Sequence, residues 1–176
     1  MANKYGVVRT DNMFGTDVRA GLVSIKYFVT EGEGNNAKDV ETEIENGRVL
    51  KADHLMDDER EIFVGVDVAA NDDLKDIVLI ASPEVMYDER LRNLDEFINL
   101  PGKPARGYRL HKGDIFSVTK EALDGVAVPA KGDVVELKAG NKLNVAKTAT
   151  NGSTVVGKIH DVNVVGRYTY YAILVG

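Results

Sequence analysis

The chain has no cysteine and no tryptophan, and only three histidines and four prolines among its 176 residues. Without cysteine there is no disulfide, no thiolate zinc site and no cysteine nucleophile. The histidines lie far apart, at positions 54, 111 and 160, and offer little for a histidine metal cluster. These absences exclude thiol chemistry and argue against a histidine metal centre.

Positive charge, aromatic side chains and long apolar runs are also scarce. Lys and Arg number 22 against 28 Asp and Glu, which gives a net charge of −6, and aromatic residues make up 7% of the chain. Binding to a nucleic-acid backbone needs a basic footprint, and base stacking needs aromatic platforms. No apolar run reaches the roughly 18 residues of a membrane span, and the first residues lack the pattern of a signal peptide. We therefore expect neither nucleic acid nor membrane as a partner.

What the sequence does contain is a series of short runs rich in β-branched and aromatic residues, separated by turn-forming pairs. Such runs predict strands, and Asn-Gly between two of them predicts a tight hairpin. One hairpin is predicted at Asn46-Gly47 and another at Gly140-Asn141. The predicted strands cover residues 22–29, 40–45, 48–52, 62–69, 77–81, 108–110, 115–119, 134–138, 142–146, 154–159 and 168–175.

Three of the four prolines interrupt this pattern in the middle of the chain, at positions 83, 101 and 104. Apolar residues between them recur every three or four positions, which predicts a short amphipathic helix around residues 87–98. The predicted organisation is an extended N-terminal arm (1–20), a first β module (21–82), a helical, proline-containing connector (83–106) and a second β module (107–176). The predicted fold class is all-β, with two related small modules that resemble barrels or sandwiches.

The two halves show an internal similarity. Asp39–Ala52 and Asp133–Ala146 lie 94 residues apart, and each holds a strand, a turn with a Gly/Asn pair and a strand that begins with a basic residue. Each is followed by an apolar strand with a glycine inside it, Gly65 and Gly157. Glycine within a strand is typical of a bulge, a bend or a close backbone approach. We interpret the pattern as a repeat of one β unit.

The sequence contains no motif that assigns a catalytic, cofactor-binding or metal-binding residue. His54 lies beside four acidic residues, but they follow one another in a polar loop, whereas metal ligands converge from separate elements. His111 and His160 have no arrangement typical of a catalytic triad, and no nucleophile elbow or phosphate loop is present. A basic run at Lys103, Arg106, Arg109 and Lys112 indicates a solvated or protein-contacting surface. We therefore expect a protein that is not an enzyme and has no cofactor.

The second half has a recognisable rhythm. It combines Gly132-Asp133-Val134-Val135, Gly140-Asn141-Lys142-Leu143, Val155-Val156-Gly157 and Ala172-Ile173-Leu174-Val175, in that order. This rhythm resembles that of capsid decoration proteins of tailed bacteriophages, also called head cement proteins. The resemblance covers residues 125–176, and 38–81 more loosely. Similar modules occur in tail-tube, head–tail joining and fibre-base proteins of phages.

The resemblance implies a virion structural protein that binds the outside of a capsid and stabilises junctions between major capsid subunits. Its implied partner is the major capsid protein, with a further copy of itself as another candidate, and its implied location is the capsid surface after synthesis in the host cytoplasm. We expect Tyr5, Val7, Val8, Arg9 and Phe14 of the arm to contact the capsid, by adding a strand to a sheet edge. The alternatives are another phage structural role, as a head–tail connector, tail or fibre-base component, and a non-viral β-barrel domain that binds a ligand.

Overall fold

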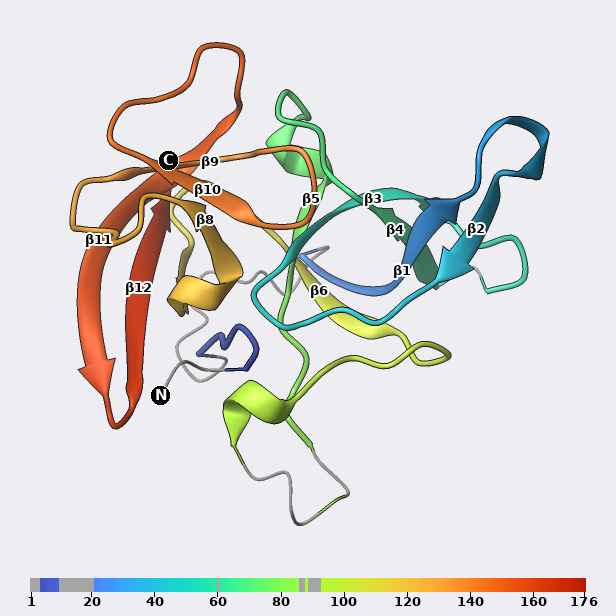
Figure 1. The fold of residues 1–176 in the computed structure, drawn as a ribbon, viewed down its shortest axis with the longest axis horizontal. Helices are drawn as coiled ribbons and strands as arrows, with labels where there is room; N and C mark the ends of the chain where they lie inside the picture. The colour runs from blue at the N-terminus through green and yellow to red at the C-terminus, as the bar shows by residue number, and fades with distance from the viewer. Residues whose placement is uncertain (1–3, 10–20, 60, 86–87, 89–92) are drawn as a thin grey trace.

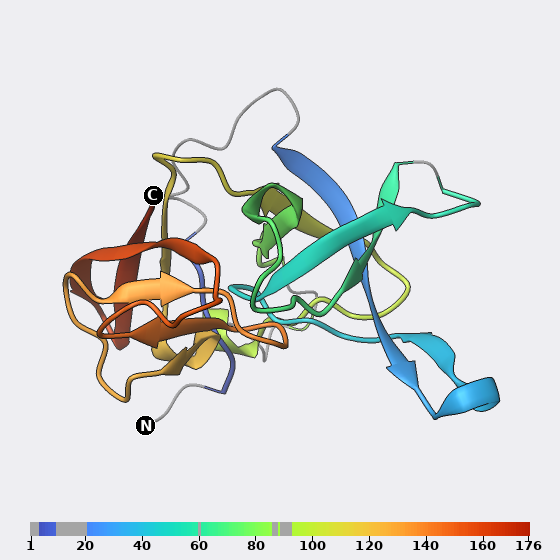
Figure 2. The same ribbon diagram turned by 90° about the horizontal axis from the view of Figure 1, so that it is seen from above.

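The computed structural model describes residues 4–9, 21–59, 61–85, 88 and 93–176, and over these residues the protein is nearly all β. Its strands form two six-stranded sheets that lie side by side in both views (Figures 1 and 2). The all-β fold with two modules is thus confirmed. The strands of the first sheet are β1 (Leu22–Glu31), β2 (Lys38–Glu41), β3 (Val49–Leu55), β4 (Ile62–Val66), β5 (Ile77–Ile80) and β6 (Ala105–Arg109). Those of the second are β7 (Ile115–Val118), β8 (Leu123–Gly125), β9 (Val134–Glu136), β10 (Leu143–Ala146), β11 (Val155–Val165) and β12 (Tyr168–Val175).

Five strands of the first sheet close into a barrel. Their order is β1-β4-β3-β5-β6, and β6 pairs back onto β1. The β1–β4 contact is parallel, and the other four contacts of the ring are antiparallel. The outer half of β1 continues past the barrel and forms a ribbon with β2, at the right of Figure 1.

The second sheet is an open, curled half-barrel with the order β7-β12-β11-β9-β10-β8. Its centre is the long hairpin β11–β12, in which Gly157 pairs with Val175 at one end and Val165 with Tyr168 at the other. The hairpin reaches well beyond the neighbouring strands in Figure 1.

The barrel and the half-barrel share a hydrophobic core, and β5 shows why. All four of its residues are fully buried, in a sequence with no polar alternation. Because successive side chains of a strand point to opposite faces, Val78 and Ile80 fill the barrel, while Ile77 and Leu79 join the core of the second module. A strand buried on both faces needs a continuous apolar run, which is what this segment has.

Backbone hydrogen bonds reinforce this contact between the modules. Val68 N–H donates to Gly140 O at 2.8 Å, and Gly140 N–H donates to Val68 O at 3.1 Å. Thr154 N–H donates to Ala70 O at 2.7 Å. The two sheets therefore form one structural unit that is joined by both side chains and backbone.

The hairpin predicted at Asn46-Gly47 is wrong, whereas the one at Gly140-Asn141 is confirmed by the antiparallel β9–β10 pair. The chain does turn at Asn46-Gly47, but β2 pairs with β1, and β3 pairs with β4 and β5. The two segments do not form a hairpin because both turn residues form hydrogen bonds with the end of β5 and the residues after it. The Asn46 side chain bonds to the backbone of Ser82, and Gly47 N–H donates to Ile80 O.

The repeat extends to the order of elements along the chain but not to their pairing. β3 and β4 are neighbours in the first sheet, whereas β10 and β11 are separated by β9 in the second. The two glycines do behave alike, because each lies next to a register shift between paired strands. A Cβ at Gly157 would lie 2.0 Å from Leu174 O, and one at Gly65 would lie 2.8 Å from the Ile25 side chain. At Gly157 the backbone of β12 thus leaves no room for a side chain, whereas at Gly65 the close atoms belong to the side chains of Ile25 and Leu50.

The helix predicted at 87–98 is not found in the part of that range that the structure describes. There the chain forms a single 3-10 turn at Leu94–Glu96, and residues 87 and 89–92 lie outside the described residues. Phe97 and Ile98 continue in extended conformation toward a bridge between Ile44 and Asn99. Further 3-10 turns occupy Gly34–Asn36, Leu74–Asp76 and Lys120–Ala122. The strand β6, which starts at Ala105, belongs to the barrel and so crosses the predicted boundary at residue 106.

Candidate functional site: a hollow beside the barrel

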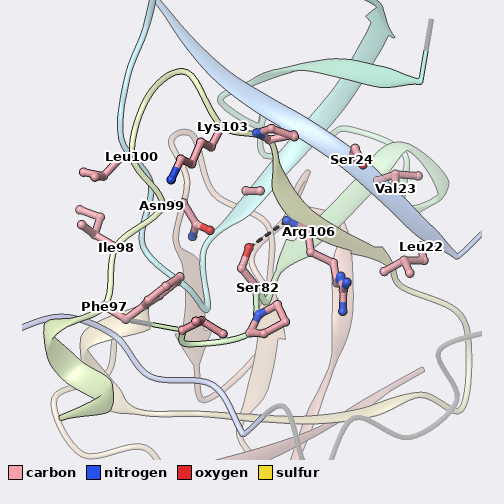
Figure 3. A pocket seen from close by; sticks show the side chains of 14 residues that line it. Leu22, Val23, Ser24, Ser82, Phe97, Ile98, Asn99, Leu100, Lys103 and Arg106 are labelled. Atoms are coloured by element: carbon pink, nitrogen blue, oxygen red, sulfur yellow. Dashed lines mark hydrogen bonds between the residues drawn. The ribbon is translucent and has the colours of Figure 1, made fainter. Parts of the chain in front are cut away.

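A concave surface lies where the segment between β5 and β6 folds back against the barrel wall (Figure 3). It encloses about 520 Å³ between the start of β1, the chain around Ser82, and residues 97–106. Three apolar side chains on its rim are more than half exposed: Leu22 at 51%, Val85 at 64% and Leu100 at 56%. Exposed apolar residues gathered around a concavity are typical of an interaction site.

The hollow is positively charged although the protein as a whole is acidic. Lys103 and Arg106 line it, and none of its 14 lining residues is acidic. Figure 3 shows Lys103 on the side of Asn99 and Leu100, and Arg106 on the side of Leu22, with the backbone N–H of Arg106 donating to Ser82 Oγ at 2.9 Å. Two of the four cations of the basic run predicted from the sequence thus lie at this site. Of the others, Arg109 stacks on the Phe63 ring and donates to Lys75 O, away from the hollow.

Buried amides hold the walls of the hollow. Asn46 is 2% exposed; its side chain donates to Ser82 O at 2.8 Å and accepts from Ser82 N–H at 3.0 Å. Asn99 Nδ2 donates to Ile44 O at 2.9 Å, and the backbones of Asn99 and Ile44 exchange two further hydrogen bonds. Because an unpaired buried polar group is costly, these bonds fix the segment in a single position.

A second cluster ties the same segment to the tip of the β11–β12 hairpin. Asp95, which is buried, accepts hydrogen bonds from Arg167 and from Tyr168 Oη, and the Lys4 backbone N–H approaches it at 3.3 Å. Burial alone would raise the pKa of Asp95, but the hydrogen bonds from Tyr168 and Lys4 outweigh it and lower the pKa below its usual range. The carboxylate is therefore charged and joins three distant parts of the chain.

The residues predicted to form a capsid-binding arm are placed differently from that expectation. Val7 and Val8 are each 1% exposed, and Val8 lies in the core of the second module. Val7 N–H donates to Thr119 Oγ1, Thr119 N–H donates to Val7 O, and Arg9 N–H donates to Ser117 O. The segment therefore pairs with the edge of β7 through an isolated bridge between Val8 and Val118, and its valines are not available to a partner.

Of the remaining arm residues, Tyr5 is partly exposed beside Lys4, and Arg9 stacks on Tyr170. Phe14 lies outside the described residues. The structure thus brings Val7, Val8 and Arg9 together on β7, but as part of the fold.

The histidines show no convergence with other ligands. His54 Nδ1 lies 2.8 Å from Asp53 on the exposed end of β3, His111 contacts Asp114 within one turn, and His160 is exposed on β11. Within the described ranges, no group of three or more His, Asp or Glu side chains could hold a metal ion. In the same ranges, no helix has the length and hydropathy to cross a bilayer.

One structural motif was present in the sequence but its meaning was missed. Lys112-Gly113-Asp114 and Lys131-Gly132-Asp133 form the same turn, with φ of 95° and 92° at the glycines. In each turn the aspartate side chain accepts the backbone N–H three residues earlier, at 2.9 Å, and the turn bonds to one hairpin strand, at Val175 or Ile159. The repeated Lys-Gly-Asp letters could have revealed the pair, which positions β7 and β9 on the two strands of the hairpin.

Comparison of the chain with protein-family models, curated proteins and solved structures finds no match.

Proposed function

We propose that this protein is a capsid decoration protein of a tailed phage, which binds the outside of the shell and stabilises junctions between major capsid subunits. The observation that supports this proposal is the position of the residues that carry the resemblance. They fall on adjacent strands of the half-barrel: Gly132-Asp133 leads into β9, Gly157 lies in β11, and Ala172–Val175 end β12.

These residues make their contacts within the protein and stabilise its fold. Asp133 closes its turn on Ala130 N–H and pairs with Lys147, and Gly132 N–H donates to Ile159 O. A partner must therefore bind elsewhere, and the hollow with its exposed apolar rim is the surface we assign to it. Its cations would face acidic groups on the shell, and its apolar rim would supply the buried area.

The proposed action needs no chemical step. A protein that binds one state of the capsid more tightly than another shifts the equilibrium toward that state by the difference in binding free energy. Binding across a junction between subunits thus opposes their separation.

The test uses expanded capsids purified without this protein and measures co-sedimentation. We expect the wild-type chain to saturate the capsids, and Leu100→Asp or Arg106→Glu to weaken binding by about tenfold or more, because both change the hollow. The matched control is Val128→Asp, since Val128 is 75% exposed and lies outside the hollow. Absence of wild-type binding would refute the function, and equal binding by all variants would refute the assigned surface.

The volume of the hollow also favours one alternative, a β-barrel domain that binds a small acidic ligand, because pockets of this volume are typical of ligand sites. Native mass spectrometry of the purified protein would show a bound small molecule in that case and none for a decoration protein. Ring-shaped particles of the pure protein in electron micrographs would instead indicate a head–tail connector or tail component.

A further inference from the structure

The outer half of β11 has an edge that no described residue covers. β9 pairs with β11 only as far as Lys158, and the last hydrogen bonds on that side join Ile159 to Gly132 and Asp133. From Asp161 to Val165, β11 pairs with β12 alone. In Figure 1 this part of β11 lies on the outside of the molecule.

The side chains on this edge are those of an interface. Val162, Val164 and Val165 are 37%, 73% and 46% exposed. Natural sheets protect free edges with charged residues, as β2 does here with Lys38, Asp39 and Glu41. The β11 edge has one charge, at Asp161, in the five residues from Asp161 to Val165. An unprotected edge with exposed valines favours addition of a further strand.

The sequence of the edge fits a second copy of itself. In an antiparallel pair with two-fold symmetry centred on Asn163, Val162 lies opposite Val164 of the second copy, and Asp161 lies opposite Val165 of the second copy. Valine pairs and amide pairs directly opposite one another are favourable, whereas like charges are not. A centre at Asp161 would set two carboxylates against each other, which the symmetric register at Asn163 avoids.

We propose that two copies of this protein associate through the β11 edges, antiparallel and centred on Asn163. The pairing is isologous, so every contact occurs twice. A strand of five residues buries little area, and the dimer is correspondingly weak and concentration-dependent. This association does not depend on the proposed capsid role.

The first test uses the absence of cysteine from the chain. Opposite residues of an antiparallel pair have Cα atoms about 4.5–5.5 Å apart, within the range of a disulfide. Asn163→Cys should therefore form an intermolecular disulfide under mild oxidation at least about tenfold faster than the control variant Val128→Cys, in which the new cysteine is likewise the single one in the chain. Asp161→Cys alone should not cross-link rapidly, whereas Asp161→Cys combined with Val165→Cys should. Equal rates for Asn163→Cys and Val128→Cys would overturn the proposal.

The second test is sedimentation velocity over a concentration series. Val164→Lys should raise the dimer dissociation constant by about tenfold or more, because the charge is introduced twice per dimer. Val128→Lys, at a valine that is as exposed as Val164, should leave the constant unchanged. A monomer at every concentration, or a dimer that Val164→Lys does not weaken, would refute the proposal. Capsid binding by the Val164→Lys monomer would leave the proposed function intact, so the two ideas fail separately.

Discussion

Substitution of Val8 by alanine tests whether residues 4–9 belong to the fold. Val8 is 1% exposed, forms a bridge with Val118 and packs in the core that both modules share. A free arm that orders only on a capsid would tolerate this change without loss of stability. A strand of the half-barrel would not.

The expected loss follows from the carbon atoms removed. Two buried methyl groups contribute about 1.6 kcal/mol in transfer free energy, at about 0.8 kcal/mol each. The cavity that remains adds on the order of 1 kcal/mol. We therefore expect Val8→Ala to lower the free energy of unfolding by about 2–3 kcal/mol.

The assay is urea unfolding followed by far-UV circular dichroism. With a slope of about 2 kcal/mol per molar urea, the midpoint should fall by roughly 1–1.5 M. Val128→Ala is the control and should change stability by less than about 0.5 kcal/mol, because Val128 is exposed. An unchanged midpoint for Val8→Ala would refute the placement of this segment and restore the arm as a free element.

Three further predictions concern the interior. Gly157→Ala should destabilise the protein by more than about 3 kcal/mol in the same urea assay, because the new Cβ would lie 2.0 Å from Leu174 O. The control is Gly152→Ala, which has open space but a φ of 87° and should cost only about 1–2 kcal/mol. A smaller loss of stability at Gly157 than at Gly152 would contradict the close approach of β11 and β12. Burial opposes ionisation of Glu136, but hydrogen bonds from Thr150 and Asn144 prevail and hold its pKa below the ordinary value of 4.5. Because the folded pKa is depressed, the stabilisation by the carboxylate is present above pH 4.5 and is lost as the pH falls through the folded pKa. Glu136→Gln should therefore be destabilising in urea titrations at pH 7 and progressively less so in acid, and a loss of stability that does not vary with pH would contradict this role of the carboxylate. Asn46→Ala should leave the backbone N–H and O of Ser82 without their partner and lower the free energy of unfolding by about 2–4 kcal/mol. The same substitution should weaken capsid binding in the co-sedimentation assay. Capsid binding at full strength would show that the Asn46 amide does not shape the wall of the hollow.

Much of the fold could be predicted from the sequence because strands are local patterns. The runs at 22–29, 77–81 and 168–175 became β1, β5 and β12 with small changes in their bounds. The bulges predicted at the glycines within strands are also confirmed, since Gly65 and Gly157 both lie beside register shifts between paired strands. Such features depend on a few neighbouring residues and on the requirement of a pleated, buried strand.

Pairing was harder to predict because it depends on residues far away in the chain. Asn46-Gly47 has the composition of a hairpin turn, but the bonds of Asn46 go to Ser82. Nothing near Val7 and Val8 signals that their partners are Thr119 and Val118, more than a hundred residues later. The hollow escaped notice for the same reason, since its rim unites Leu22, Val85 and Leu100 only after the barrel has closed.

The closure of the barrel also constrains the order in which the chain acquires its structure. β1 is the first strand of the barrel to be synthesised, but its last neighbour, β6, does not begin until Ala105. Residues 7–9 find their partners later still, when Ser117 of β7 and the adjacent Thr119 have been made. Contacts at such separations carry a large loop-closure entropy and are associated with slow folding. During synthesis, the valines near the N-terminus and one side of β1 thus stay without their native partners until about two thirds of the chain has been made, and this apolar surface is exposed for that time.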